Sequence, residues 1–241
     1  MDNSDEKSTN SRKKDKDSLL HFKVSRFIIE SSAKLKLNSV TLASACVLYH
    51  RFYQECEIED YDPYTIAATA IFLATKIEEQ HTRLRDVVNV CHRTLFPSKP
   101  LLEIGRELYD LKDTIANCEL LILRVLEFKV TCDHPHKYIL HYLMSLSQFF
   151  NRREWERHTV AQTAWAILQD CYHGTICLSH RPQLVAISCI YLALLTCKVE
   201  VPLKHSCKTP WWKVFHSTVS KHEISTVMDE IVDLYNLEKQ C

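Results

Sequence analysis

Glycine is almost missing from this chain. Gly105 and Gly174 are the only two among 241 residues, where average usage would give roughly seventeen. Phosphate-binding loops, nucleophile elbows and tight hairpin turns need glycine, because the backbone there takes a positive φ or approaches a ligand closely. With two isolated glycines, no P-loop, dinucleotide-binding fingerprint or kinase glycine loop can be written. The sequence therefore favours a helical protein and argues against most nucleotide-dependent enzymes.

The composition is that of a folded protein without excess charge. Hydrophobic residues make up 46% of the chain and charged residues 25%, and the formal net charge is +0. A neutral chain lacks the broad positive field that holds a protein on nucleic acid or anionic lipid, so we expect neither as a direct partner. The longest apolar run, Leu184–Cys197, is too short to cross about 30 Å of hydrocarbon. It predicts a buried core helix rather than a membrane span.

Eleven cysteines are scattered along the chain, several of them within apolar segments, such as Cys46 and Cys189. No Cys-x-x-Cys pair occurs, which argues against a zinc ribbon or knuckle. Residues 1–18 are hydrophilic, so we expect no secretory signal and no oxidising compartment. Reduced, structural cysteines in an intracellular protein are the better interpretation.

Helical periodicity begins at Leu19 and continues to the end of the chain. Residues 1–18 alternate basic and acidic side chains without apolar periodicity, which predicts a disordered tail. No segment alternates with period two for long enough to require a sheet, so the expected fold class is all-α. Helices are predicted near residues 22–37, 41–55, 63–79, 85–93, 103–126, 135–150, 159–173, 182–197 and 221–238.

Three capping signals mark the starts of helices. Asp62 precedes Pro63, and the run Asp-His-Pro occupies residues 133–135. An acid before a proline is typical of an N-cap followed by the first helical turn. Ser220 and Glu223 match a capping box, in which each side chain bonds the backbone N–H of the other residue. We therefore expect a helix to begin at each of these three places.

The chain contains an internal repeat with an offset of 119 residues, and this repeat decides the architecture. After the shift, two helical segments align without a gap and share the phrase Pro-x3-Ala-x3-Ile-[Phe/Tyr]-Leu-Ala. The matched pairs are Ala45/Ala164, Tyr53/Tyr172, Pro63/Pro182, Ala67/Ala186, Ile71/Ile190, Leu73/Leu192 and Ala74/Ala193. The period is too long for solenoid repeats. It predicts two duplicated domains of about five helices, at residues 19–132 and 133–241, after a tail at 1–18.

Lys76 breaks the repeat, and Glu119 interrupts an apolar helix. Lys76 ends the first copy of the shared phrase, whereas Leu195 takes its place in the second. A lysine at the end of a buried helix can extend its amine to solvent or complement the helix dipole. Glu119 lies within a nearly continuous apolar helix and shares a face with Leu123 and Leu126. Burying a lone carboxylate is costly, so Glu119 is expected to be paired, exposed or reserved for a partner.

These residues belong to motifs that resemble the first cyclin box. The motifs are Leu-Ala-Thr-Lys-Ile-Glu-Glu at 73–79 and, about forty residues on, Glu-x3-Leu-x2-Leu-x-Phe at 119–128. Three further phrases look like the transcription-type cyclins: His-Arg-Phe-Tyr at 50–53, His-Pro-His-Lys-Tyr at 134–138 and Trp-Trp-Lys-Val-Phe at 211–215. The resemblance covers roughly residues 19–240. It implies two tandem five-helix cyclin boxes, the first of which binds a kinase.

The resemblance also implies a site. In cyclins, the box lysine and the later helical glutamate bind main-chain groups beside the C-helix of a cyclin-dependent kinase, and the matching residues here are Lys76 and Glu119. The apolar contacts would come from Leu73, Ile77, Leu123, Leu126, Phe128 and Val130. The chain would then be a non-catalytic activating subunit without metal or cofactor, in a heterodimer with its kinase.

Among the transcription-type cyclins, the subgroup that this chain most resembles implies that its partner is cyclin-dependent kinase 10 and that the protein acts in the nucleus. The chain itself offers only a weak basic cluster, Arg-Lys-Lys at 12–14, whose charge is offset by acidic residues, so a solvated tail is the preferred interpretation of this segment. One departure concerns substrates. The first helix, near residues 22–37, lacks the Met-Arg-Ala-Ile-Leu phrase with which cell-cycle cyclins dock substrates, so we expect no docking of that kind.

Three other functions remain open on the sequence. Cys132, His134 and His136, or Cys171 with His173, have spacings that can assemble a metal site or a nucleophile. A cyclin fold also serves as a general-transcription-factor module, although the basic helices and zinc ribbon of that class are missing. The third function is a cyclin-fold scaffold that activates no kinase, against which Lys76 and Glu119 argue.

Overall fold

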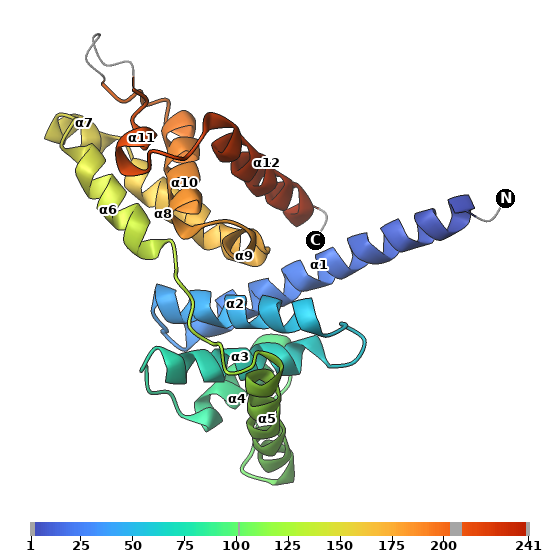
Figure 1. Cartoon of the computed structure of the whole chain (residues 1–241). Coiled ribbons are helices and arrows are strands. Elements are labelled where there is room, and N and C mark those ends of the chain that lie inside the picture. Colours follow the sequence, from blue (N-terminus) through green and yellow to red (C-terminus); the bar gives the residue numbers. More distant parts are fainter. Residues whose placement is uncertain (1–2, 101, 203–208, 240–241) are drawn as a thin grey trace. The chain divides into compact units, whose positions relative to one another are not determined.

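The computed structural model describes residues 3–100, 102–202 and 209–239, and the side chains within them apart from those of 3–15 and 154. These residues form helices joined by turns and loops, and the described part contains no strand (Figure 1). The all-α prediction is therefore confirmed. None of the described helices is long and apolar enough to cross a membrane.

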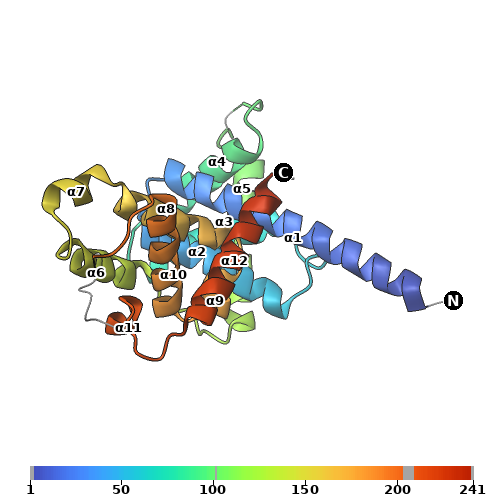
Figure 2. The same cartoon turned by 90° about the horizontal axis from the view of Figure 1, so that it is seen from above.

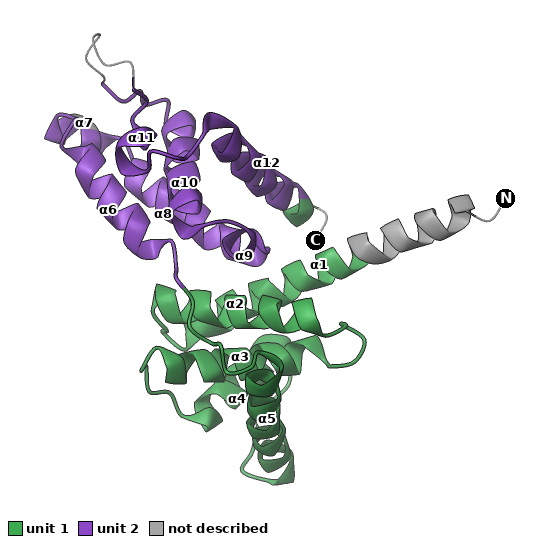
Figure 3. Cartoon of the chain, in the orientation of Figure 1, with its two compact units in different colours: residues 1–132, 237–241 green, residues 133–236 purple. Residues whose placement is uncertain are grey.

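The chain divides into two compact units, which are described separately below. Unit 1 comprises residues 1–132 together with 237–241, and unit 2 comprises residues 133–236 (Figure 3).

Unit 1 is built around α3. Its helices are α1 (Asn3–Lys34), α2 (Ser39–Glu55), α3 (Pro63–Ile77), α4 (Leu84–Leu95) and α5 (Arg106–Val125). The other four helices all pack against α3. Ala67, Ala70 and Ala74 of α3 are fully buried, and their small side chains let neighbouring helices approach closely. This explains why small residues recur in the repeated phrase.

Unit 2 repeats this plan around α10. Its helices are α6 (His136–Ser147), α7 (Arg152–Arg157), α8 (Val160–Asp170), the 3-10 turn η1 (Cys171–His173), α9 (Ile176–Ser179), α10 (Pro182–Thr196), α11 (Trp212–Phe215) and α12 (Lys221–Glu238), whose last residues are grouped with unit 1. α10 packs against α8 and α6 (Figure 2). The first and last residues of α10 are those of α3 shifted by the repeat offset of 119 residues.

Helices begin at all three predicted places, and two of the three predicted caps form. The Asp62 carboxylate accepts the Thr65 backbone N–H at 2.8 Å, and Pro63 opens α3. At α12, the Ser220 backbone N–H donates to Glu223 Oε2 at 2.7 Å, and the Glu223 N–H donates to Ser220 Oγ at 3.2 Å. Both predictions are confirmed.

At the third place a helix begins as predicted, but Asp133 does not cap it. α6 begins at His136, directly after Pro135, and the Asp133 carboxylate caps no backbone group among the described contacts. Asp133 instead binds the Lys137 amine at 2.6 Å and accepts the Tyr138 hydroxyl at 2.9 Å. Both donors lie about one helical turn after Asp133, so they bind its carboxylate in place of the backbone N–H groups.

The prediction of an N-terminal tail outside the folded core is confirmed: α1 is assigned from Asn3, but none of the described side chains before Phe22 is buried. The segment contains no glycine or proline that would interrupt a helix continuing outward from the packed part of α1. It also contains no apolar face. Among the described residues 3–18, the helix is a continuation of the packed part of α1.

The chain ends its main helices without glycine. Residues of the left-handed region follow α1, α3, α5 and α10, namely Lys36 (φ 57°), Glu79 (φ 53°), Glu127 (φ 50°) and Lys198 (φ 54°). After α3, the Gln80 N–H reaches back to the Thr75 carbonyl at 2.9 Å, and after α10 the Val199 N–H reaches Leu194 at 2.9 Å. Both are Schellman-type caps. They occupy equivalent positions of the repeat, which therefore extends to the backbone.

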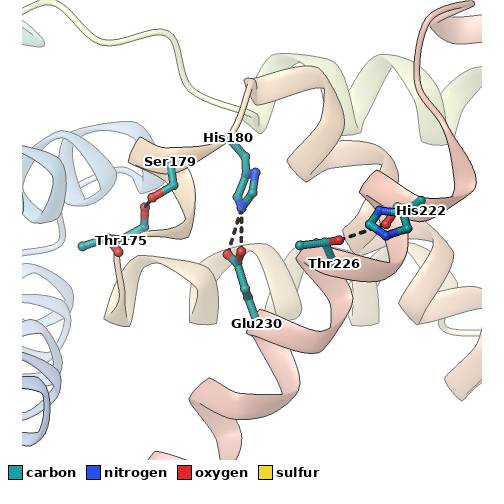
Figure 4. Close-up of polar contacts among 6 residues, drawn as sticks. All are labelled: Thr175, Ser179, His180, His222, Thr226 and Glu230. Atoms are coloured by element: carbon teal, nitrogen blue, oxygen red, sulfur yellow. Dashed lines mark hydrogen bonds and ion pairs between the residues drawn. The ribbon is translucent and has the colours of Figure 1, made fainter. Parts of the chain in front are cut away.

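The C-terminal helix is held to unit 2 by polar and apolar contacts. Glu230 accepts from His180 Nε2 at 2.8 and 3.0 Å (Figure 4). The Tyr235 hydroxyl donates to Asp170 at 2.7 Å. Leu234 is buried, and its Cδ1 would lie only 2.8 Å from a Cβ on Gly174. That close approach gives Gly174 a packing role, because any side chain there would displace Leu234.

Candidate functional site

Lys76 and Glu119 meet on the surface of unit 1. Lys76 lies in the last turn of α3, and Glu119 projects from the second half of α5. The Lys76 amine contacts both carboxylate oxygens, at 2.6 Å to Oε1 and 2.7 Å to Oε2. The lysine side chain is 50% exposed and the glutamate side chain 14% exposed. Glu119 is thus paired, and the pair is open to solvent on the lysine side.

Two features of the local structure favour the position of the Lys76 amine. A cation at the C-terminal end of α3 complements the helix dipole, and the amine also lies 4.3 Å from the centre of the Phe72 ring, which favours a cation. An ion pair with a half-exposed partner contributes little to stability, about 0–1 kcal/mol. The fold therefore depends little on the pair, whose donors and acceptors are accessible to another molecule.

The apolar residues expected to surround the pair fall into two groups. Leu73 and Leu126 are buried, at 4% and 5% exposure, so they pack beneath the surface. Ile77, Leu123 and Val130 are partly exposed, whereas Phe128 is 67% exposed. Only the second group lies where another protein can touch it directly. Leu73 and Leu126 hold that surface in place from below.

The turn after α5 presents Phe128. Glu127 and Phe128 both have left-handed φ values, 50° and 59°, which cost about 1–2 kcal/mol per residue in the absence of glycine. Two hydrogen bonds fix the turn: the Phe128 N–H donates to the Leu123 carbonyl and the Lys129 N–H to the Leu126 carbonyl, each at 2.8 Å. An exposed aromatic ring held by a strained turn is typical of a binding surface.

Sequence reasoning missed three residues of this surface. Leu120, next to Glu119, is 54% exposed on an apolar helix, and its only sequence signal is that neighbour. Glu78 accepts the Ser44 hydroxyl at 2.6 Å. Gln80 Oε1 accepts the Asn38 backbone N–H and the Thr41 hydroxyl, each at 3.0 Å. Glu78 and Gln80 thereby tie the end of α3, and with it Lys76, to the start of α2.

The second unit lacks an equivalent charged pair at this position. Leu195 occupies the place of Lys76 at the end of α10 and is 55% exposed. The surface at the end of α3 is therefore specific to the first unit.

The histidines proposed for a metal site have other partners. His134 Nδ1 bonds the Tyr172 hydroxyl at 3.1 Å, and the His136 ring stacks on Tyr172 with centroids 5.6 Å apart. Burial, with a smaller contribution from His134, lowers the pKa of His136 to about 4. Among the residues that the structure describes, no group of three His, Cys, Asp or Glu side chains is arranged to hold a metal ion.

The buried thiols are poorly suited to nucleophilic chemistry. Burial raises the pKa of the Cys91 thiol to about 12 and also raises that of Cys46. Cys171 lies 3.9 Å from Cys189, and this contact together with burial raises its pKa as well. Because the thiolate is the reactive form, these cysteines act as small core residues.

Two protein families match the chain. The family described as "Cyclin, N-terminal domain" matches residues 4–131, and "Cyclin-T2-like, C-terminal domain" matches residues 134–234. The first match alone covers more than half of the chain. This chain belongs to the cyclin family, and its fold consists of two cyclin-box domains.

Its curated relatives are transcription-type cyclins. Cyclin-L2 of Mus musculus is 33% identical over 210 residues, which cover 85% of this chain and 38% of the relative. Cyclin-K of Homo sapiens is 27% identical over 217 residues, covering 89% and 36%. Cyclin pch1 of Schizosaccharomyces pombe is 29% identical over 223 residues, covering 92% and 63%. The chain thus spans from about a third to somewhat under two thirds of the length of these relatives.

Chains in solved kinase complexes share the fold. A chain of the yeast RNA Pol II CTD kinase CTDK-1 complex matches with a TM-score of 0.71 at 19% identity, over 93% of this chain and 67% of that chain. A chain of the yeast TFIIK (Kin28/Ccl1/Tfb3) complex matches with a TM-score of 0.65 at 15% identity, over 94% and 89%. At these identities the likeness concerns the fold.

Proposed function

We propose that this chain is the activating regulatory subunit of a cyclin-dependent serine/threonine kinase. The single observation that carries the proposal is the Lys76–Glu119 pair on the surface of the first cyclin box, whose lysine is replaced by Leu195 in the second. A duplicated fold needs no such asymmetry for its own stability. A partner that binds one box accounts for it.

The chemistry of the pair suits recognition of main-chain groups. The Lys76 amine has three donors and the Glu119 carboxylate accepts through two oxygens, while their mutual contact uses only part of this capacity. The lysine would donate to carbonyl oxygens beside the kinase C-helix, and the glutamate would accept from backbone N–H groups. Phe128, Leu120 and Ile77 would supply the apolar area around these polar contacts.

Activation would follow from differential binding. A kinase is inactive when its C-helix is displaced and its Lys–Glu pair is separated. A rigid surface that fits only the inward C-helix stabilises that arrangement, and a preference of about 5.5 kcal/mol converts a 1:99 population into 99:1. All catalytic residues would belong to the kinase, and this chain would itself be non-catalytic.

We further propose cyclin-dependent kinase 10 as the partner and the nucleus as the site of action. The basis for the kinase is the resemblance of the sequence motifs to the cyclin Q (cyclin M) subgroup of the transcription-type cyclins. The basis for the nucleus is the group as a whole, represented by relatives such as Cyclin-K and Cyclin-L2.

The test is binding of the full chain to a panel of cyclin-dependent kinases that includes cyclin-dependent kinase 10. We expect the wild type to form a heterodimer and the Lys76→Ala/Glu119→Ala variant to lose it. A matched control is Arg106→Ala/Asp110→Ala, which removes another ion pair of α5 whose side chains are 95% and 68% exposed. The control should bind like the wild type.

Two other results would redirect the assignment. If the wild type binds no kinase in the panel, the chain is a cyclin-fold scaffold rather than an activator. If it instead binds DNA with an affinity that falls steeply as salt rises, it is a module like the general transcription factors.

A further inference from the structure

A cavity of about 380 Å³ lies beside the Lys76–Glu119 pair, where α3 ends and α4 begins. Its lining residues are Phe72, Thr75, Lys76, His81, Thr82, Arg83 and Leu84. No acidic residue is among them. Since Lys76 both lines the cavity and forms the ion pair, any molecule bound to the pair also lies at the mouth of this cavity.

The two charged residues that line the cavity, Lys76 and Arg83, are both basic. His81 and Arg83 are exposed, and the contacts of the described residues include no side-chain hydrogen bond or ion pair for either. The run Gln-His-Thr-Arg-Leu-Arg at 80–85 contains two arginines, and the acids that flank it, Glu79 and Asp86, do not line the cavity. Lys76 adds less, because Glu119 already neutralises it. Arg83 is therefore the main charge facing the cavity.

The hydroxyl groups of the lining are already in use. The Thr75 hydroxyl donates to the Phe72 carbonyl at 2.7 Å, and the Thr82 hydroxyl donates to the Gln80 carbonyl at 3.2 Å. A ligand in the cavity must then find its donors on Arg83, on His81 and on the open side of Lys76. A guanidinium, an imidazole and an ammonium together favour an anion with several oxygen acceptors.

We propose that this cavity takes an anionic side chain of the bound kinase, a carboxylate or a phosphorylated residue, while Lys76 and Glu119 hold the kinase main chain. The inference rests on the proposed function, and it names which chemistry the kinase presents next to its C-helix. Arg83 binds the anion through its guanidinium fork, and His81 closes the other side. The contact gives the complex an electrostatic component that the nearly neutral Lys76–Glu119 pair does not supply.

The test is the charge reversal Arg83→Glu in the full chain, compared with Arg93→Glu in the last turn of α4. Arg93 is exposed and does not line the cavity. We expect Arg83→Glu to weaken kinase binding about tenfold or more at low salt, with a smaller loss at high salt because the interaction is screened. Arg93→Glu should change the affinity less than about twofold.

Thermal unfolding separates this effect from misfolding. Arg83 immediately precedes α4, where a negative charge complements the helix dipole. The Arg83→Glu variant should therefore unfold at the same or a higher temperature than the wild type, while it binds the kinase more weakly. A loss of stability that parallels the loss of binding would overturn the proposal.

The kinase is used both phosphorylated and after phosphatase treatment. If only the phosphorylated kinase distinguishes Arg83→Glu from the wild type, the anion is a phosphate; if both forms do, it is a carboxylate. Equal binding by Arg83→Glu and Arg93→Glu, with loss of binding by Lys76→Ala/Glu119→Ala, overturns this inference alone. No binding by the wild type to any kinase overturns the proposed function and this inference together.

Discussion

One pair of side chains distinguishes the two cyclin boxes at the scale of residues. Sequence reasoning found Lys76 and Glu119 because one breaks the repeat and the other interrupts an apolar helix. It could not establish that they pair, since 43 residues separate them and only the packing of α5 on α3 brings them within 2.6 Å. It also could not separate buried Leu73 and Leu126 from exposed Phe128, because their exposure depends on how the helices pack around α3 and on the turn after α5.

The pair should matter far more for binding than for folding. We expect Lys76→Ala/Glu119→Ala to change the free energy of unfolding by less than about 1 kcal/mol, because Lys76 is half exposed. Urea denaturation of both single variants and the double variant measures the coupling between the two residues. A coupling of several kcal/mol would mean that the pair is structural, and it would contradict the role given to it here.

His136 should make stability depend on pH. Its folded pKa of about 4 lies below the unfolded value of about 6.5, so between these values the unfolded chain binds more protons. Stability should rise with pH through this window and fall as the pH drops from 6.5 toward 4, by at most about 1.4 kcal/mol per pH unit. We expect His136→Gln to flatten this dependence and His141→Gln, at an exposed position of α6, to leave it unchanged. Denaturant midpoints measured across this pH range provide the test, and equal slopes for the two variants would refute the prediction.

At the scale of elements, the helices and their repeat were largely predictable. α3 and α10 start at prolines that the sequence marks, and their bounds agree with the repeat offset. The short helices α7, α9 and α11 were not predicted, because four to six residues are too few to show a helical period. The left-handed caps were also not predicted, since Lys36, Glu79 and Lys198 occupy positions where glycine is the usual signal.

Replacing the left-handed residue of one of these caps with glycine should stabilise the chain. Lys198 is exposed and has a φ of 54°, so Lys198→Gly removes the strain of a left-handed side chain at the cost of a more flexible unfolded state. We expect a gain of up to about 1 kcal/mol in the free energy of unfolding. Lys112→Gly within α5 is the control and should lose about 1 kcal/mol. Calorimetry that finds equal losses for both variants would contradict the role of the cap.

At the scale of the whole molecule, the duplication provides two cyclin boxes, of which only the first carries the charged pair. The sequence predicted this organisation from the repeat offset, and the two family matches fall on either side of residue 132. The two-domain organisation does not identify the kinase that the chain binds. The identity of the kinase depends on surface residues of both proteins, whereas the repeat and the core patterns describe only the fold.

The most direct measurement of the central claim is phosphate transfer by purified cyclin-dependent kinase 10 as this chain is titrated into it. If the chain is an activating subunit, activity should rise and saturate at one chain per kinase. Lys76→Ala/Glu119→Ala should give no rise, and the control Arg106→Ala/Asp110→Ala should give the full rise. Saturable binding without any increase in activity would contradict activation, and equal activation by both double variants would show that the Lys76–Glu119 pair is not the site.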